Sequence, residues 1–484
     1  MKNVVIIGSG IGGSGIGALL TNHVKVSITL LEQNDIIGGR CGSYYKYDDE
    51  GQKFKMDVGC HIFNTAGKGP LGQILKDIDR PNAVKWEPVR NPGPKFAYKG
   101  TFFNFPKEAR KVGIKRKTVN DMIALMMTIY SVKPEEIPAL DEVSLISFLD
   151  QHTKNFQAKS LFSVQGAACF GLPPQDVSAG EYVRMIQDNI NARSLGYCRG
   201  GTGAIPEAYV DRIKDADGKI ITGDEGRVSK IVIENNTAIG VEHGLDKNYI
   251  PADIVIANSD IKSTVLKLVG EKYFENKYIR YIKDLIWGGR GCSLKLALNK
   301  KVTPYKMITY LPPGELEEGG HSALGNQSIV DNIRKGIMPD QTGLLINVTS
   351  NFDPGLCPEG YQIILTATLT QGSEASPELE RKYQKVCMKS IVALFPEIED
   401  SLVIEEFVSN SYLREKMGKE GSSTGIGQCV GQVGTKRPSQ VAPVRNLYFS
   451  SCDAGGYGVG TELGAQSALD LFAYMKKNKI IELI

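Results

Sequence analysis

The chain lacks the sequence features of several large protein classes. No apolar run approaches the roughly 18 residues that cross a bilayer, and no charged-then-apolar leader with a cleavage site precedes the first motif. We therefore expect neither a membrane-spanning helix nor a secretory signal. The net charge is only +3 and no basic tail is present, which argues against a nucleic-acid partner.

Cysteine and histidine are sparse and unclustered. The nine cysteines include no Cys-x-x-Cys pair, and the five histidines show no metal-ligand spacing. An odd number of cysteines scattered along the chain is typical of reduced thiols, as in proteins of a reducing compartment. We expect a cytoplasmic protein with no metal site.

The composition is that of a large folded protein. The chain has 484 residues, of which 42% are hydrophobic and 23% charged. This length exceeds one typical domain and predicts two or three.

The first motif lies at the N-terminus. The apolar run Val4–Ile7 predicts a strand buried on both faces, and it leads into Gly8-x-Gly10-x-x-Gly13. These glycines would allow a tight turn, the approach of a pyrophosphate and close packing of a helix. A second predicted strand ends at Glu32, where a carboxylate can bind a ribose hydroxyl. The pattern predicts a dinucleotide site and leaves nicotinamide and flavin dinucleotides open.

Later motifs bear on the choice between a nicotinamide and a flavin dinucleotide. Gly38-Gly39-Arg40 and then Asp57-Val58-Gly59 follow the first unit, and the strand-like Asn446–Phe449 runs into Ser450-Ser451-Cys452-Asp453-Ala454 and a glycine-rich turn. Together the motifs resemble those of the FAD-dependent oxidoreductases of the amine oxidase, phytoene desaturase and carotenoid isomerase superfamily. The phytoene desaturase and carotenoid isomerase branch is the closer likeness. The resemblance implies FAD as cofactor.

The resemblance also implies roles for individual residues. It places Asp453 near the ribityl–pyrophosphate region, the backbone of Val228 beside adenine, and His61 by the flavin edge. The candidate cofactor-binding residues are Gly8, Gly10, Ile11, Gly12, Gly13, Glu32, Gln33, Gly39, Arg40, Asp57, Gly59, His61, Val228, Asn258, Asp453, Gly458 and Val459.

The candidate catalytic residues are His61, Tyr457 and Glu462. A histidine hydrogen-bonded within a loop is the alternative for His61. For Glu462 the alternative is a favourable place in the first turn of a helix. The chain departs from the family pattern at Cys452, where glycine commonly precedes the Asp, and a side chain there would crowd the pyrophosphate.

The implied fold is α/β. We expect a Rossmann-type, glutathione-reductase-like FAD-binding domain and an α+β substrate domain built on an antiparallel sheet with a helical insertion. The expected FAD-binding segments are 1–75, 200–290 and 440–484. The expected substrate-domain segments are 76–199 and 291–439, with a helical cap at about 107–190.

The helical cap carries a basic stretch ahead of an apolar, Met-bearing segment. Lys107, Arg110, Lys111 and Lys115 precede Met122–Met127, a pattern that suits a membrane surface. The alternative is an ordinary solvated basic face beside a core helix, because Met-rich stripes usually pack in cores.

The predicted function is that of an FAD-dependent oxidoreductase. By resemblance, it would desaturate, saturate or isomerise carbon–carbon bonds of an apolar isoprenoid or polyene, with the electron acceptor or donor left open. Two alternatives are a flavin amine oxidase, which would need an aromatic pair beside the flavin, and a non-catalytic FAD-binding protein.

Overall fold

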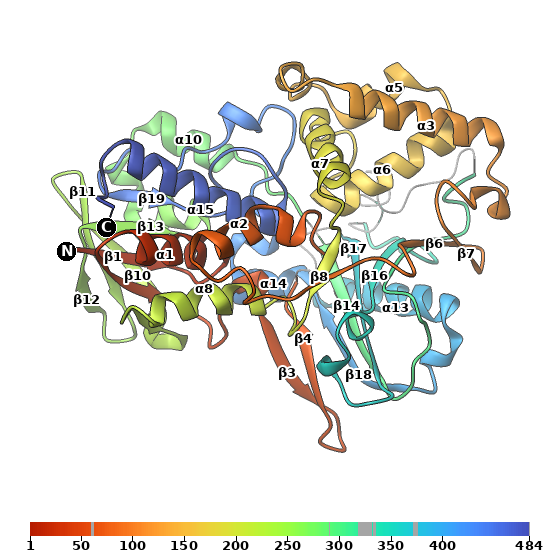
Figure 1. Cartoon of the computed structure of the whole chain (residues 1–484), viewed down its shortest axis with the longest axis horizontal. Helices are drawn as coiled ribbons and strands as arrows, with labels where there is room; N and C mark the ends of the chain where they lie inside the picture. Colours follow the sequence, from red (N-terminus) through yellow and green to blue (C-terminus); the bar gives the residue numbers. More distant parts are fainter. Residues whose placement is uncertain (60–61, 290, 318–331, 333–334, 371–375, 484) are drawn as a thin grey trace.

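The computed structural model describes residues 1–59, 62–289, 291–317, 332, 335–370 and 376–483. Figure 1 shows two parts side by side. One part holds both chain termini and a parallel sheet with its helices. The other holds a larger sheet, with a helical block above it in this view.

The first part is built on a five-stranded parallel sheet with strand order β19-β13-β1-β2-β9. Its strands are β1 (Lys2–Ile7), β2 (Val26–Leu31), β9 (Lys219–Ile221), β13 (Ile254–Ala257) and β19 (Leu447–Phe449). Val4 and Ile6 of β1 pack in one hydrophobic core, while Val5 and Ile7 pack in another on the opposite face. The prediction of a strand buried on both faces is confirmed.

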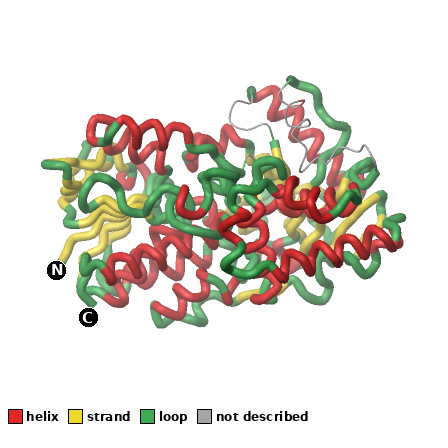
Figure 2. Tube along the Cα trace, turned by 90° about the horizontal axis from the view of Figure 1, so that it is seen from above, coloured by secondary structure: helices red, strands yellow, loops and turns green. Residues whose placement is uncertain are grey.

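Different layers cover the two faces of this sheet, as Figure 2 shows from a second direction. One face carries the helices α1 (Ile11–His23), α2 (Pro70–Asp77), α8 (Ala204–Lys214) and α15 (Gly460–Lys477). The other face packs against a three-stranded antiparallel sheet of β10 (Val228–Glu234), β11 (Thr237–His243) and β12 (Asn248–Pro251). The hairpin of β3 (Ser43–Tyr47) and β4 (Lys53–Asp57) projects from this part.

The second part is built on a seven-stranded sheet with strand order β18-β14-β17-β16-β15-β6-β7. Its strands are β6 (Lys95–Tyr98), β7 (Thr101–Phe103), β14 (Gly291–Leu298), β15 (Met307–Leu311), β16 (Leu344–Asn347), β17 (Gln362–Leu369) and β18 (Leu402–Val408). All pairs are antiparallel except β15 with β6. Helix α13 (Pro377–Leu394) packs on the sheet through one hydrophobic cluster.

The helical block is formed by α3 (Arg116–Ser131), α4 (Ile137–Leu140), α5 (Leu145–His152), α6 (Phe156–Phe170) and α7 (Ala179–Ala192). The sequence pattern predicts helices at the places of α3, α5 and α7 but none at α6. Most of α6 is buried, so apolar residues surround its axis and leave no single apolar stripe.

The remaining elements are short. They are α9 (Ile261–Ser263), α10 (Asn276–Asp284), α12 (Thr349–Phe352), α14 (Asn410–Met417), β5 (Trp86–Pro88) and β8 (Gly196–Cys198). Over the residues that the structure describes, no helix combines the length and apolar character needed to cross a membrane.

Candidate functional site

A cleft of about 300 Å³ lies where the carboxyl ends of β1, β2 and β13 meet. We call it the cofactor cleft. Its walls also include the Gly38–Cys41 turn and the Met417–Lys419 loop. In open α/β sheets, ligands bind at this end of the strands.

The glycine turn after β1 is held by side chains from neighbouring strand ends. Asn258 follows β13, and in the amide orientation that satisfies its neighbours its Oδ1 accepts from the Gly10 N–H at 3.0 Å. Its Nδ2 then donates to the carbonyl of Ser450, which follows β19, at 2.8 Å. A Cβ at Gly13 would lie 2.1 Å from the Gly8 carbonyl oxygen. Gly13 therefore serves the packing of α1 and does not line the cleft.

Glu32 is fixed in the cleft wall by four donors. Its Oε2 accepts from the N–H and the hydroxyl of Ser9 at 3.0 and 2.7 Å, and its Oε1 from the N–H and side-chain amide of Asn34 at 2.9 and 3.0 Å. A carboxylate offers about four acceptor positions. A ribose hydroxyl would therefore share or replace one of these donors, and the half-buried Asn34 amide is the one that can turn away.

Arg40 is a buried cation with an incomplete set of partners. Its guanidinium donates to the carbonyls of Met417 and Gly418 at 3.5 and 3.3 Å, while its buried Nε has no partner among the described residues. Burial lowers the pKa of Arg40, although nearby Asp453 opposes this. An unpaired guanidinium N–H beside the glycine turn fits an anionic pyrophosphate.

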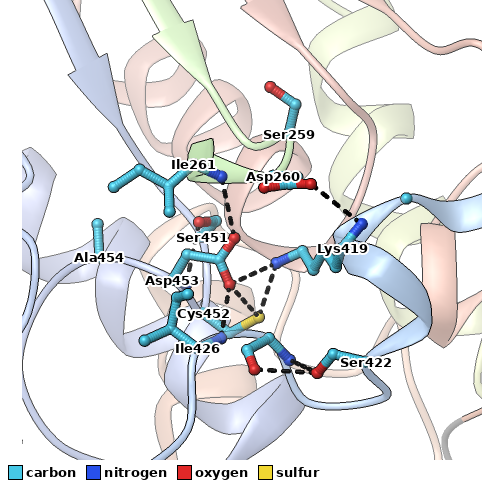
Figure 3. Close-up of polar contacts among 12 residues, drawn as sticks. Ser259, Asp260, Ile261, Lys419, Ser422, Ile426, Ser451, Cys452, Asp453 and Ala454 are labelled. Atoms are coloured by element: carbon cyan, nitrogen blue, oxygen red, sulfur yellow. Dashed lines mark hydrogen bonds and ion pairs between the residues drawn. The ribbon is translucent and has the colours of Figure 1, made fainter. Parts of the chain in front are cut away.

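The other wall of the cleft presents Lys419 and Cys452, and Figure 3 shows their partners. The Nζ atom of Lys419 lies 2.8 Å from Asp453 Oδ1 and 3.1 Å from Cys452 Sγ. Asp453 also accepts from the N–H groups of Ile261 and Ile426 at 3.2 and 3.1 Å. Burial would raise the pKa of Asp453, but Lys419 and these N–H groups hold it below its usual range.

Asp453 lies behind the wall of the cofactor cleft, and its predicted cofactor-binding role stays a prediction. It is fully buried and does not line the cleft, because its carboxylate is turned toward Lys419. The arrangement gives Asp453 no direct access to a cofactor. Lys419 and Cys452 face the cleft in its place, and the sequence analysis did not name them as cofactor-binding residues.

A second cavity of about 510 Å³ lies between the helical block and the seven-stranded sheet. We call it the apolar cavity, because apolar side chains dominate its wall, among them Phe96, Phe105, Met122, Met126, Leu161 and Phe162. It shares with the cofactor cleft the residues Arg40, Ser423, Thr424, Gly460 and Thr461. We call these five residues the junction, because they belong to the walls of both the apolar cavity and the cofactor cleft.

The glycine-rich segment before α15 borders the junction. Val459 and Glu462 line the apolar cavity. The Oε1 atom of Glu462 accepts from the N–H and hydroxyl of Thr65 at 2.7 and 2.6 Å. Burial raises the pKa of Glu462, although these donors oppose it. Glu462 thus ties the start of α15 to the segment before α2, and a catalytic role for it stays a prediction.

Tyr457 lies away from the junction. Its ring is 38% exposed and stacks on the Arg184 guanidinium, whose carbon lies 3.6 Å from the ring centroid. It lines neither cavity, and the aromatic residues in the described wall of the apolar cavity are all phenylalanine. The described residues in the walls of the two cavities therefore include no tyrosine or tryptophan pair of the kind expected for an amine oxidase.

Asp57 is likewise buried behind the site, and its predicted cofactor-binding role stays a prediction. It is 2% exposed, and it accepts from Ser43 Oγ at 2.7 Å, from the Thr202 N–H at 2.9 Å and from the Tyr197 hydroxyl. It lines neither cavity, so it fastens three segments together.

The segment after Asp57 reaches the apolar cavity. Gly59 lines this cavity and not the cofactor cleft. His61, a predicted catalytic and cofactor-binding residue, lies outside the described residues.

Lys295 of β14 is a functional-site neighbour that the sequence analysis did not identify. It is 1% exposed, and its Nζ donates to the carbonyls of Asp57 and Val58 at 2.6 and 3.0 Å. Burial lowers its pKa to about 8. A lone lysine in an otherwise apolar strand was the available signal. The residue links the seven-stranded sheet to the segment that leads to Gly59.

Most of the other predicted cofactor residues lie together. Those that line the cofactor cleft are Gly8, Gly10, Ile11, Gly12, Glu32, Gln33, Gly39, Arg40, Val228 and Asn258. Gly458 does not line either cavity. Its N–H donates to Glu181 at 3.1 Å and its carbonyl accepts from Gln428 at 2.7 Å.

Comparison with known proteins decides the family. The family of flavin containing amine oxidoreductases matches residues 18–470. The chain belongs to this family. FAD is accordingly its cofactor, and the glycine turn, Glu32 and Arg40 are the residues that fit the adenosine and pyrophosphate parts.

Some curated relatives of this flavin containing amine oxidoreductase are enzymes named for polyene substrates. A phytoene desaturase of Fusarium fujikuroi is 24% identical over 405 residues, covering 75% of this chain and 65% of the desaturase. An all-trans-retinol 13,14-reductase of Macaca fascicularis is 23% identical over 303 residues, covering 54% of this chain and 48% of the reductase. The chain thus spans less than two thirds of the length of these relatives.

Solved structures share the fold at low sequence identity. An oxidoreductase from Methanosarcina mazei has a TM-score of 0.71 and 18% identity, covering 97% of this chain and 100% of that one. A redesigned putrescine oxidase has a TM-score of 0.67 and 15% identity, covering 98% and 99%.

The first prediction concerns Glu32. In Glu32→Ala, the Ser9 and Asn34 donors lose their acceptor and a ribose hydroxyl loses its partner, so FAD affinity should fall about 10- to 100-fold. Fluorescence titration of the apoprotein with FAD measures this. The exposed Glu50→Ala is the matched control. A change below about twofold in Glu32→Ala would place Glu32 away from the ribose.

A second prediction rests on Glu181 of α7, which ties the helical block to the glycine-rich segment. It is 1% exposed, accepts from the Gly458 N–H at 3.1 Å and pairs with Arg184 at 2.8 Å. Burial raises its pKa from 4.5 to about 7, although the Gly458 N–H and Arg184 oppose the shift. Between these two values the folded protein holds a proton that the unfolded chain releases, so this group's contribution to stability falls as pH rises.

Glu181→Gln removes this titration. The free energy of urea unfolding of the variant relative to wild type should therefore increase by about 1–3 kcal/mol between pH 5 and pH 8. The other titrating groups contribute equally to the unfolding free energies of the variant and of wild type, so their contributions cancel in the difference. The exposed Glu135→Gln should follow the wild-type pH profile. An unchanged profile in Glu181→Gln would show that the carboxyl group titrates normally.

Proposed function

We propose that the protein oxidises, reduces or isomerises carbon–carbon bonds of an apolar isoprenoid or polyene, with FAD as the redox cofactor. The observation that carries the proposal is the apolar cavity, which adjoins the cofactor cleft and shares the five junction residues with it. The names of the curated relatives, a phytoene desaturase and a retinol reductase, support a polyene substrate.

The chemistry of the cavity wall favours such a substrate. The chain of a polyene offers no partners for polar groups, so the methionine and phenylalanine side chains that dominate the wall suit it. When bound, the flavin supplies the hydride chemistry. The protein's own residues would hold the cofactor and the substrate. Glu32 would bind the ribose, Arg40 and Lys419 would lie by the anionic part, and Phe162 and its neighbours would exclude water.

Amine oxidation is the second candidate, because the fold is shared with a putrescine oxidase. Its support is weaker, since Tyr457 lies outside both cavities and phenylalanines supply the aromatic wall. A non-catalytic flavoprotein is the third candidate. A Danio rerio relative that is 23% identical over 328 residues bears the name inactive all-trans-retinol 13,14-reductase.

A third prediction tests the proposal with FAD-loaded protein under anaerobic conditions. All-trans-retinol or phytoene should change the absorbance of the oxidised or dithionite-reduced flavin, and putrescine and benzylamine should not. Flavin reduction by an amine alone would establish amine oxidation instead. A bound flavin that responds to none of these compounds would establish the non-catalytic alternative.

Two tryptophan variants locate the reaction. Ala168 lines the apolar cavity, so Ala168→Trp should overpack it and lower polyene turnover at least tenfold while FAD stays bound. Ala216 is exposed in the other part of the molecule, and Ala216→Trp should leave turnover unchanged. Equal turnover in both variants would show that the substrate does not use this cavity.

We also propose that α3 contacts a lipid surface from which the substrate enters. Ile123, Met127 and Tyr130 are 45%, 68% and 56% exposed and repeat along one outer face of α3. Met122 and Met126 of the same helix line the apolar cavity. Four basic residues are exposed just before or at the start of the helix, namely Lys111, Lys115, Arg116 and Lys117. Apolar side chains next to cations suit an anionic bilayer.

A fourth prediction follows from this surface. The protein should float with anionic liposomes, and added salt should weaken the association. Ile123→Asp with Met127→Asp should reduce the bound fraction at least tenfold, because both side chains would insert into the interface. Leu245→Asp is the control, since Leu245 is 76% exposed in a distant loop. An equal effect of the control would refute a specific role for α3.

A further inference from the structure

Helix α6 contributes one polar side chain to an otherwise apolar stretch of cavity wall. Five of its residues line the apolar cavity together with Gln165, namely Leu161, Phe162, Val164, Ala168 and Cys169. The side chain of Gln165 is exposed, while the flanking Val164 and Gly166 are buried. Gln165 therefore points into the cavity from the middle of a buried helix.

A tyrosine of α7 sets the orientation of the Gln165 amide. Tyr182 is 0% exposed, and its hydroxyl donates to Gln165 Oε1 at 2.9 Å. Burial raises the pKa of Tyr182 well above 10, so the hydroxyl keeps its proton. A buried hydroxyl needs an acceptor, and the Gln165 carbonyl is the acceptor that the described residues provide. The Nε2 atom of Gln165 is left with no partner in this part of the chain.

The position of Gln165 along the cavity follows from the packing of α6. A Cβ on Gly171, just after the helix, would lie 2.2 Å from Gly289 Cα, and one on Gly289 would lie 2.6 Å from the backbone nitrogen of the junction residue Thr424. The C-terminal end of α6 therefore abuts the junction. Gln165 precedes Gly171 by six residues, which is about 9 Å along the helix axis. The amide thus lies roughly 9 Å or more, measured along α6, from the place where the cavity meets the cleft.

We infer that Gln165 determines specificity by donating a hydrogen bond to a substrate oxygen. The substrate is then an isoprenoid or polyene that carries an alcohol, aldehyde or acid group. This inference rests on the proposed function and narrows it. A pure hydrocarbon would leave the Gln165 N–H groups unpaired inside an apolar cavity, which is unfavourable. Tyr182 acts as a positioning residue, and the Leu161–Phe162 side of α6 contacts the apolar tail.

The test compares all-trans-retinol with the matching hydrocarbon in which a methyl group replaces the hydroxymethyl group. Binding to the FAD-loaded full chain is measured from the change in flavin absorbance. Wild type should bind the alcohol roughly tenfold more tightly. Gln165→Leu should lose about this factor for the alcohol and none for the hydrocarbon. Gln151→Leu, a change at an exposed position of α5, should behave as wild type.

A second variant distinguishes hydrogen bonding from simple packing. Gln165→Glu keeps an acceptor for Tyr182 but presents an oxygen to the cavity in place of an N–H group. It should therefore retain all-trans-retinol, whose hydroxyl can donate, and lose affinity for all-trans-retinal, whose carbonyl can only accept. A purely structural role of Gln165 would change both affinities alike.

Three results would overturn the inference. The first is that wild type binds the alcohol and the hydrocarbon with equal affinity. The second is that Gln165→Leu loses affinity for both ligands by the same factor. The third is a protein that retains FAD and binds no polyene at all, which would also refute the proposed function. The first two leave that function intact, so the two failures are distinguishable.

Discussion

The fit of the glycine turn among three strand ends is the constraint on which the rest of the site depends. Asn258 after β13 and Ser450 after β19 clasp the turn after β1, and a Cβ at Gly13 would press on the Gly8 carbonyl. Ser9, which lies within the turn, fixes two neighbouring parts of the site by hydrogen bonds. It donates to Glu32 and accepts from the Gly38 N–H, so the ribose carboxylate and the Gly38–Cys41 turn are placed by the same loop.

Buried polar links connect this turn to the apolar cavity. Lys295 ties the seven-stranded sheet to the Asp57–Val58 backbone, Glu181 ties α7 to Gly458, and Lys419 pairs with Asp453 behind the cleft. Buried charges are costly unless they are paired and hydrogen-bonded, and their contribution lies in fixing one arrangement among several. In this protein they fix the position of the junction between cleft and cavity.

Local patterns predicted much of the fold. The burial of β1 on both faces follows from the continuous apolar run Val4–Ile7. Apolar stretches at 293–298 and 307–311 likewise indicate strands, and β14 and β15 form there. Helix α6 was not predicted, because it is apolar around most of its circumference. The apolar pattern of Leu344–Ser350 predicts one longer strand there, but β16 ends at Asn347 and Thr349–Phe352 forms a helical turn. For Asp57 and Asp453, the motifs do not indicate which way the side chains turn. Their orientation depends on distant partners such as Tyr197 and Lys419.

The central claim is that the flavin ring and the substrate meet at the junction. The most direct measurement is a crystal structure of the FAD-loaded protein soaked with all-trans-retinol. We predict the isoalloxazine ring beside Thr424 and Thr461, with the polyene in the apolar cavity against α3 and α6. A flavin ring directed away from the apolar cavity, or a polyene bound elsewhere on the protein, would contradict the account.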